Sequence, residues 1–232
     1  MRRVGILGGV GPLASCYLYE RIIKNTKANI DQEHVNLIIN SHAEIPNRTD
    51  YLLDNTKDNP LPIIESDLKE LESLGVDFIV INCNTAHNFY DYLSKSINVP
   101  LLNIIELTVK SIDKNKKIIG IMATDGTNKG KLYQKALIDN NFVPITPPED
   151  IQKKIMNIIG EVKEGKNIDK DYFFSIIDFF KENNCDQVLL GCTELSVLRE
   201  EYKLDDYYLD PIEVISKEII LRSGKVFIGE SD

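Results

Sequence analysis

A short apolar pattern occurs twice in this chain of 232 residues, and each copy runs from an aspartate to a cysteine. The first copy spans residues 77–83 and the second spans residues 186–192. Another similar pair, residues 2–7 and 116–122, precedes them in the same order, and a turn of small residues follows each. The two members of each pair lie more than 100 residues apart. Repeats with this separation indicate two similar folding units of roughly 100 residues each.

The residues between these repeats alternate between strand and helix patterns. Residues 78–81 form an unbroken apolar run, as expected for a parallel strand that is covered on both faces. Apolar residues from 61 to 71 recur at the spacing of one helix face, and Gly75 is suited to end that helix. The polar segment 41–62 is predicted to be a long loop. We therefore expect an α/β fold with two pseudo-symmetric lobes, each a parallel sheet flanked by helices.

The repeat also sets the expected domain boundaries. We assign residues 1–97 plus 210–232 to an N-terminal lobe that carries Cys83, so the last helix returns to the first lobe. Residues 98–209 form the C-terminal lobe, which carries Cys192. Ligands of parallel α/β units bind beyond the carboxyl ends of the strands. The active site is therefore expected in the cleft between the lobes.

The two repeated cysteines, Cys83 and Cys192, each end a predicted strand just before a predicted helix. A helix start carries partial positive charge and free N–H groups, and both favour the thiolate over the thiol. Two such groups that face each other across a substrate can take a proton from one face of a carbon and return one on the other. The alternative is that both are small buried hydrophobic residues, but their matching positions favour a shared site.

Composition and charge exclude several classes of function. With 27 Lys and Arg against 36 Asp and Glu, the net charge is −9, and an acidic surface disfavours nucleic acid as a partner. No apolar run approaches the roughly 20 residues that a membrane span needs. The four cysteines form no CxxC pair, so no metal site is expected, and we predict reduced thiols, most of them buried. The residues before Cys16 have the outline of a lipoprotein signal, but their glycines make a poor apolar helix, so the cytoplasm is the expected location.

Several segments resemble the signatures of the aspartate/glutamate racemase superfamily, and most closely those of its aspartate racemase branch. The segments are residues 8–12, 46–49, 82–87, 123–127, 191–194 and 210–211. The resemblance covers nearly the whole chain. It implies an amino-acid racemase that needs no pyridoxal phosphate, no other cofactor and no metal, and that acts on a small acidic amino acid. Relatives are often dimers, so a homodimer is expected.

The resemblance also implies roles for individual residues. Cys83 and Cys192 match the two catalytic cysteines of the family. Cys192 would take the α-proton from the L-enantiomer, and Cys83 would take it from the D-enantiomer. Asn84, Thr85 and Thr193 match residues that hold the α-carboxylate.

Further matches concern the substrate's side chain. Thr124 lies in the corresponding turn of the second unit, and Arg48 matches an arginine that holds the side-chain carboxylate together with a lysine. That lysine would be Lys163, although Lys166 is an alternative because the alignment needs a gap there. The loop that carries Arg48 is expected to close over the substrate. Glu194 either orients the second cysteine or caps a helix.

Other interpretations of the same residues lead to other functions. Residues 9–14 fit a loose dinucleotide-binding pattern, with Glu44 as the ribose-binding acid. His87 follows Cys83 by one helical turn and could be the base of a thiol hydrolase or transferase. A protein with two lobes could also bind a dicarboxylate in the cleft without catalysis. Within the superfamily, a glutamate or broad-specificity racemase is the alternative, because aspartate and glutamate differ by one methylene.

Overall fold

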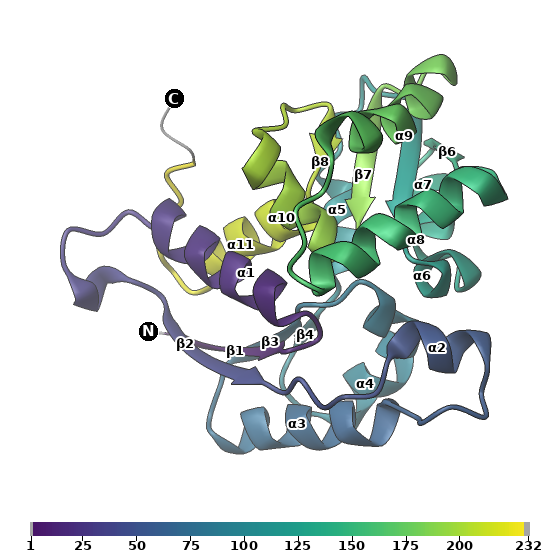
Figure 1. Cartoon of the computed structure of the whole chain (residues 1–232). Helices are drawn as coiled ribbons and strands as arrows, with labels where there is room; N and C mark the ends of the chain where they lie inside the picture. The colour runs from purple at the N-terminus through teal and green to yellow at the C-terminus, as the bar shows by residue number, and fades with distance from the viewer. Residues whose placement is uncertain (1, 230–232) are drawn as a thin grey trace.

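The computed structural model describes residues 2–229, which contain two four-stranded parallel sheets (Figure 1). The first sheet has the order β2-β1-β3-β4 and the second has the order β6-β5-β7-β8. The strands of the first sheet are β1 (Arg3–Gly8), β2 (Asn36–Ser41), β3 (Phe78–Ile81) and β4 (Leu101–Leu102). Those of the second sheet are β5 (Ile118–Ala123), β6 (Val143–Ile145), β7 (Gln187–Gly191) and β8 (Tyr208–Leu209). The equivalent orders confirm the predicted fold class of two similar α/β units.

Helices flank both sheets (Figure 1). The helices of the first half are α1 (Pro12–Asn25), the 3₁₀ turn η1 (Asp31–Glu33), α2 (Arg48–Leu53), α3 (Leu61–Ser73), the 3₁₀ turn η2 (Thr85–Phe89), α4 (Tyr90–Ser96) and α5 (Ile104–Lys110). Those of the second half are α6 (Asp125–Lys129), α7 (Leu132–Asp139), α8 (Glu149–Lys163), α9 (Lys170–Glu182), α10 (Thr193–Tyr202) and α11 (Pro211–Arg222). No helix within residues 2–229 is long and apolar enough to cross a membrane.

Local sequence accounts for several of these elements. Gly75 has a φ of 73° directly after α3, which is the left-handed conformation expected of a residue that ends a helix. Pro12 occupies the first turn of α1, where its missing N–H leaves no hydrogen bond unmade. In α8, the buried apolar residues between Ile155 and Val162 lie on one helix face. Burial of that face fixes the position of Lys163, the last residue of the helix.

The segment 41–62 is not only a loop, because it contains α2. Asn47 caps the start of this short helix by accepting a hydrogen bond from the N–H of Thr49 at 3.0 Å. Lys129 of α6 donates to the carbonyl groups of Leu52 and Leu53 at the other end. Since Lys129 comes from a distant part of the chain, local periodicity could not indicate this helix.

The strand pairing bears on the proposed lobe boundary. β4 pairs with β3, so residues 101–102 belong to the first sheet although they follow the proposed boundary at residue 97. β8 pairs with β7, which keeps residues 208–209 in the second sheet. α11 then packs against α1 and α5 (Figure 1). We keep the two lobes as a proposal, with the first sheet extended to β4.

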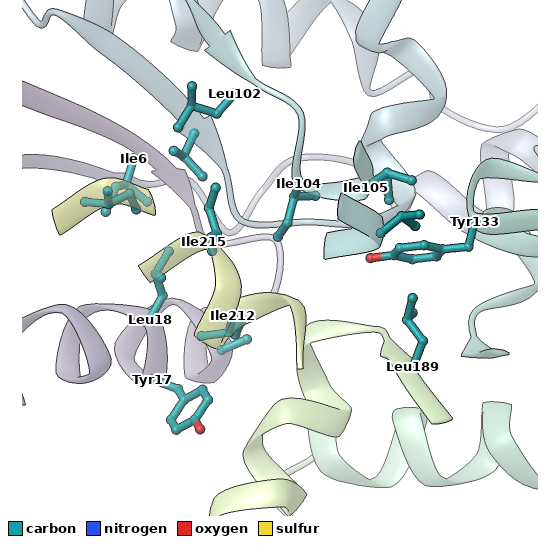
Figure 2. Packing of buried hydrophobic residues seen from close by; sticks show 14 of the residues in the cluster. Ile6, Tyr17, Leu18, Leu102, Ile104, Ile105, Tyr133, Leu189, Ile212 and Ile215 are labelled. Carbon is teal, nitrogen blue, oxygen red and sulfur yellow. The ribbon is translucent and has the colours of Figure 1, made fainter. Parts of the chain in front are cut away.

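A continuous apolar core joins the two halves (Figure 2). Ile6 and Leu18 of the first unit lie in the same cluster as Tyr133 and Leu189 of the second. Ile215 of α11 is completely buried within it. The two units are therefore joined by one shared apolar core, and not by surface contacts alone.

Candidate active site

Cys83 and Cys192 lie at the carboxyl ends of β3 and β7, which occupy equivalent places in the two sheets. Cys192 is the residue that caps the start of α10. Both side chains are buried, and both line the same narrow cavity, which has about 290 Å³ of empty space. The fold therefore brings the two repeated thiols together at one site. The other two cysteines are Cys16, which is exposed, and Cys185, which is buried; all four are free thiols.

All the other residues that the resemblance singled out also line this cavity. They are Arg48, Asn84, Thr85, Thr124, Lys163 and Thr193. Lys166 does not line it; its ammonium group pairs with Glu164, and both side chains are exposed to solvent. Of the two lysines that the sequence left open, Lys163 is the one at the cavity.

The sequence analysis missed some residues of the cavity and left another undecided. Val10, Asn47 and Thr49 line it but were given no role. A signal was present, because each lies inside or next to a segment that resembles the family signatures. Glu194 also lines the cavity.

Three threonine hydroxyl groups meet at the wall of the cavity, where Thr85 and Thr124 line it, and they connect the two units. The Thr85 oxygen lies 2.9 Å from that of Thr124 and 3.1 Å from that of Thr127. Thr124 donates to Thr127 at 3.0 Å, and its oxygen also accepts from the Thr127 backbone N–H. A hydroxyl has one proton and two acceptor sites, so this cluster can turn its protons towards a bound anion.

Asn84 is almost completely buried beside Cys83. Its side-chain oxygen accepts a hydrogen bond from the Tyr133 hydroxyl, whose pKa is raised by burial so that it stays a donor. Its Nδ2 has no partner within residues 2–229, and a buried donor without a partner is costly. The side chain does not cap the 3₁₀ turn that follows. Nδ2 remains available to donate to a carboxylate.

Cys192 donates a hydrogen bond from Sγ to Oε2 of Glu194, at 2.9 Å. Burial raises the pKa of the Cys192 thiol well above its ordinary value, and the negative charge of Glu194 raises it further. Lys163 and the backbone N–H of Glu194 act in the opposite direction but do not outweigh these effects. Loss of hydration at Cys192 therefore opposes the thiolate that a helix start would favour.

His87 lies beneath Cys83 and is fully buried, which lowers its pKa and keeps the ring neutral. Its Nε2 accepts from the backbone N–H of Ile104 at 3.2 Å, so the proton lies on Nδ1. Nδ1 donates that proton to the backbone carbonyl of Cys83 at 2.9 Å. Neither ring nitrogen is left for the thiol, so His87 is not the base that a thiol hydrolase requires.

Two cationic side chains stand where the cavity meets a larger outer pocket, which has about 930 Å³ of empty space. Arg48 and Lys163 line both spaces. The Arg48 guanidinium donates to the carbonyl groups of Ile45, Pro46 and Val10 at 3.0–3.2 Å. Its Nε is buried without a partner, and no carboxylate within residues 2–229 pairs with it. This uncompensated charge favours an anion in the cavity.

The glycine turn before α1 lines the outer pocket, and its two glycines also approach other atoms of the protein closely. Gly9 has a φ of 79°, and a Cβ there would lie 2.4 Å from the backbone nitrogen of His42. A Cβ on Gly11 would lie 2.4 Å from Oε1 of Glu194. Close packing against a loop and a carboxylate therefore accounts for both glycines without a bound dinucleotide.

Comparisons with known proteins agree with the geometry of this site, because the proteins that match are racemases. A sequence model of the Asp/Glu/hydantoin racemase family matches residues 7–218. The broad-specificity amino-acid racemase RacX of Bacillus subtilis is 25% identical over 222 residues, which cover 94% of this chain and 96% of that protein. The glutamate racemase of Aquifex pyrophilus is 31% identical over 168 residues, or 69% of this chain and 62% of that protein. Among solved structures, an aspartate racemase of Picrophilus torridus aligns with a TM-score of 0.86 at 30% identity, covering 98% of this chain and 96% of that one.

Proposed function

The chain belongs to the Asp/Glu/hydantoin racemase family, and on this premise we propose that it interconverts L- and D-aspartate without a cofactor. The observation that carries the proposal is the shared cavity of Cys83 and Cys192. One thiol comes from each of two equivalent strand ends, and proton transfer on opposite faces of a carbon needs two such groups. A non-catalytic dicarboxylate-binding protein would account for the cations but not for the paired thiols.

We assign the two carboxylates of aspartate to two sides of the cavity. The α-carboxylate is held by Nδ2 of Asn84 and by the hydroxyl groups of Thr85 and Thr193, all of which line the cavity. The side-chain carboxylate is held by Arg48 and Lys163 at the mouth. Removal of the α-proton builds negative charge next to the α-carboxylate, and donors fixed before the reaction stabilise that charge without reorganisation.

The proposed reaction uses the two thiols in opposite states. With L-aspartate, the Cys192 thiolate takes the α-proton, and the Cys83 thiol delivers its own proton to the opposite face of the carbon. With D-aspartate, the roles are exchanged. Either direction regenerates one thiol and one thiolate, so no cofactor enters the proton balance.

Two observations favour a wider substrate range as the second candidate. The cavity opens into an outer pocket that shares Arg48 and Lys163 with it, so a longer side chain has room to extend. The Bacillus subtilis relative is described as a broad-specificity racemase, and the Aquifex pyrophilus relative as a glutamate racemase. Aspartate remains the first proposal because the cavity itself is small, and because the Picrophilus torridus structure is described as an aspartate racemase.

Proton NMR in D₂O tests the proposal. Purified protein is incubated with L-aspartate, and separately with D-aspartate, and the products are resolved by chiral chromatography. Loss of the α-proton signal together with the opposite enantiomer is the expected result. Exchange of glutamate or other amino acids at a higher rate would support the wider substrate range. Absence of exchange with every amino acid tested would overturn the racemase proposal.

Two further proposals concern the state of the protein. We propose a cytoplasmic location. The proposed chemistry requires free thiols, and a reducing compartment such as the cytoplasm keeps thiols from forming disulfides. We also propose a homodimer, and light scattering coupled to gel filtration would distinguish it from a monomer of 26.4 kDa.

A further inference from the structure

Tyr133 is a buried tyrosine of the second unit that contacts a residue next to each of the two thiols. It is the second residue of α7, and its side chain is completely buried. Figure 2 shows its ring within the apolar core that the two units share. Its hydroxyl donates a hydrogen bond to Oδ1 of Asn84, which follows Cys83 in the first unit. No step of the proposed reaction uses Tyr133, so this contact between the units needs another explanation.

The ring of Tyr133 packs against the segment that carries the second thiol. A Cβ on Gly191 would lie 3.0 Å from Cε2 of the ring, so the ring rests against backbone at this point. Gly191 directly precedes Cys192. Burial raises the pKa of the Tyr133 hydroxyl, and the negative charge of Cys192 adds to this effect. The hydroxyl therefore keeps its proton at neutral pH and remains a hydrogen-bond donor.

The hydrogen bond from Tyr133 fixes the orientation of the Asn84 amide. An amide has an acceptor oxygen on one side and a donor nitrogen on the other. Asn84 lines the cavity, and with Oδ1 held by the tyrosine, Nδ2 is the end left for a ligand. This nitrogen is buried and has no partner within residues 2–229. A half-turn of the amide would put the oxygen in its place, and an oxygen repels a carboxylate.

We propose that Tyr133 is a positioning residue, which orients the Asn84 amide so that Nδ2 donates to the α-carboxylate of the substrate. This inference rests on the proposed function, in which Asn84 binds that carboxylate. Because the ring is fixed against the segment of Cys192, the tyrosine also places a donor from the first unit relative to the thiol of the second. Both enantiomers present the same carboxylate, so both directions of the reaction depend on Tyr133.

Tyr133→Phe tests this role, because it keeps the ring and removes only the hydroxyl. KM should rise about 10-fold for L-aspartate and for D-aspartate alike, as for the loss of one hydrogen bond to a charged group. Tyr202→Phe is the matched control, since it removes a tyrosine hydroxyl that donates to the Ile168 carbonyl at 2.6 Å, away from the cavity. That variant should change KM less than about 2-fold. Thermal unfolding of both variants checks that they fold.

Two fragments of aspartate distinguish orientation of the amide from general support of the site. Succinate keeps both carboxylates and lacks the amino group, whereas β-alanine keeps the amino group and lacks the α-carboxylate. Tyr133→Phe should weaken inhibition by succinate about 10-fold and leave inhibition by β-alanine within about 2-fold. Equal weakening of the two inhibitors would mean that the hydroxyl only supports the structure, and the positioning role would be overturned.

A second substitution tests whether Tyr133 acts through Asn84. Asn84→Ala removes the amide, so adding Tyr133→Phe to it should change KM by less than a further 2-fold or so. Two residues that act independently would instead multiply their separate effects. Full multiplication of the two effects would therefore contradict the proposal.

The racemase proposal and this inference can fail separately. If wild-type protein binds succinate in a calorimeter but exchanges neither enantiomer of aspartate, the racemase proposal fails. Calorimetry of succinate with Tyr133→Phe then still decides the role of the tyrosine. If wild type racemises aspartate and Tyr133→Phe changes neither KM nor succinate binding, only the positioning role is overturned. If wild type neither exchanges aspartate nor binds succinate, both are overturned.

Discussion

Cys83 and Cys192 follow equivalent strands, yet the chain continues differently after each of them. After Cys83 comes the 3₁₀ turn η2, and His87 of that turn holds the backbone carbonyl of the cysteine. After Cys192 comes the full α-helix α10, and Glu194 holds the thiol itself. The strand order is equivalent in both units, whereas the turns after the cysteines and the groups around the sulfur atoms differ. Two similar units thus hold two thiols in unlike surroundings.

A second equivalent pair shows the same contrast. Asn103 follows β4 and caps α5, accepting from the N–H groups of Ile105 and Glu106. Asp210 follows β8 and caps α11, accepting from the N–H of Ile212 at 2.8 Å. Both side chains cap the start of a helix, but Asn103 is a neutral amide and Asp210 is a buried acid.

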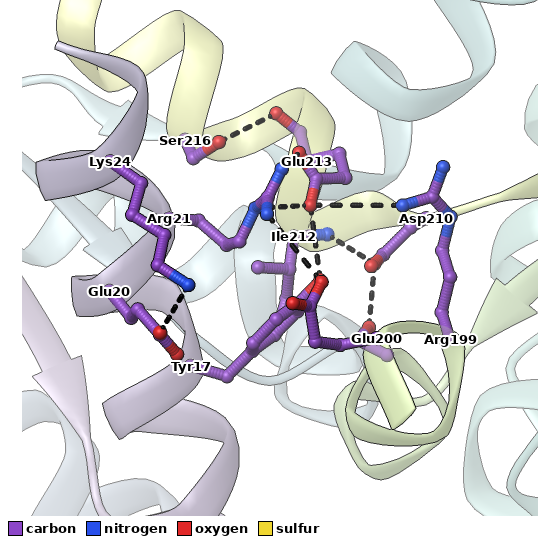
Figure 3. Close-up of polar contacts among 11 residues, drawn as sticks. Tyr17, Glu20, Arg21, Lys24, Arg199, Glu200, Asp210, Ile212, Glu213 and Ser216 are labelled. Atoms are coloured by element: carbon purple, nitrogen blue, oxygen red, sulfur yellow. Dashed lines mark hydrogen bonds and ion pairs between the residues drawn. The ribbon is translucent and has the colours of Figure 1, made fainter. Parts of the chain in front are cut away.

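The surroundings of Asp210 form a charged cluster between helices (Figure 3). The Ser196 hydroxyl donates to Asp210 at 2.6 Å, and this links α10 to α11. Glu213 of α11 pairs with Arg21 of α1, and Arg199 of α10 approaches it at 3.9 Å. Burial raises the pKa of Asp210 to about 6. The cap of α11 therefore lies among charged side chains that connect α11 to α1 and α10.

The largest expected effect is on the rate of racemisation, when either of the two thiols is removed. Cys83→Ala and Cys192→Ala should each lower racemisation by about 10²–10⁴-fold, because each removes the acid or base on one face. Each should keep exchange with only one enantiomer: L-aspartate for Cys83→Ala and D-aspartate for Cys192→Ala. Chiral chromatography and NMR in D₂O measure the two properties. Racemisation at the wild-type rate by either variant would contradict the two-base mechanism.

The next prediction concerns Asp210→Asn, a substitution that makes the helix cap at residue 210 like the one at Asn103. Since the pKa of Asp210 is raised from 3.8 to about 6 on folding, its protonated form stabilises the fold. This contribution is fully present below pH about 4 and is lost as the pH rises through about 6, by about 3 kcal/mol in total. Asp210→Asn keeps the cap, as Asn103 does, and should remove this pH dependence. Urea unfolding at pH 4.5, 6 and 7.5 measures it; an unchanged slope of stability against pH would refute the assignment.

A smaller effect on KM is expected from the two cationic side chains at the mouth of the cavity, one from each unit. Arg48→Ala removes charge-assisted hydrogen bonds of about 1.5–3 kcal/mol, so KM for aspartate should rise about 10–100-fold. Lys163→Ala should act in the same direction and more weakly, since Lys163 is an exposed single point charge. Lys166→Ala is the matched control and should change KM less than about 2-fold, because that lysine pairs on the surface. A larger effect of Lys166→Ala than of Lys163→Ala would reverse the assignment.

The smallest effect perturbs the carboxylate beside Cys192 without changing it. A Cβ at Gly11 would displace the end of the Glu194 side chain, which is flexible, so Gly11→Ala should fold normally. We expect exchange of L-aspartate in the Cys83→Ala background to fall by about 10-fold, because the carboxylate that accepts the Cys192 thiol hydrogen bond is displaced. Gly160→Ala in α8 is the control, because a Cβ there meets no atom within 4 Å. Equal behaviour of the two glycine variants would argue against a role for this contact.

Much of the architecture was predictable because it depends on local sequence. The apolar run of β3, the helical spacing of α3 and the positive φ of Gly75 are properties of short segments, and each was found where it was predicted. By contrast, α2 depends on Lys129 from the other unit, and β4 is only two residues long. Neither leaves a periodic signal in its own segment.

The sequence by itself determined that two similar units each end a buried strand in a cysteine, and the parallel strands then had to bring those cysteines to one edge of each sheet. Only the tertiary structure decided the chemical state around them. Cys192 lies at the start of a helix, yet burial and the charge of Glu194 raise the pKa of its thiol. Asn84 turns to Tyr133 instead of capping a helix. The direction of a side chain and its loss of water depend on atoms from distant segments, which local periodicity does not encode.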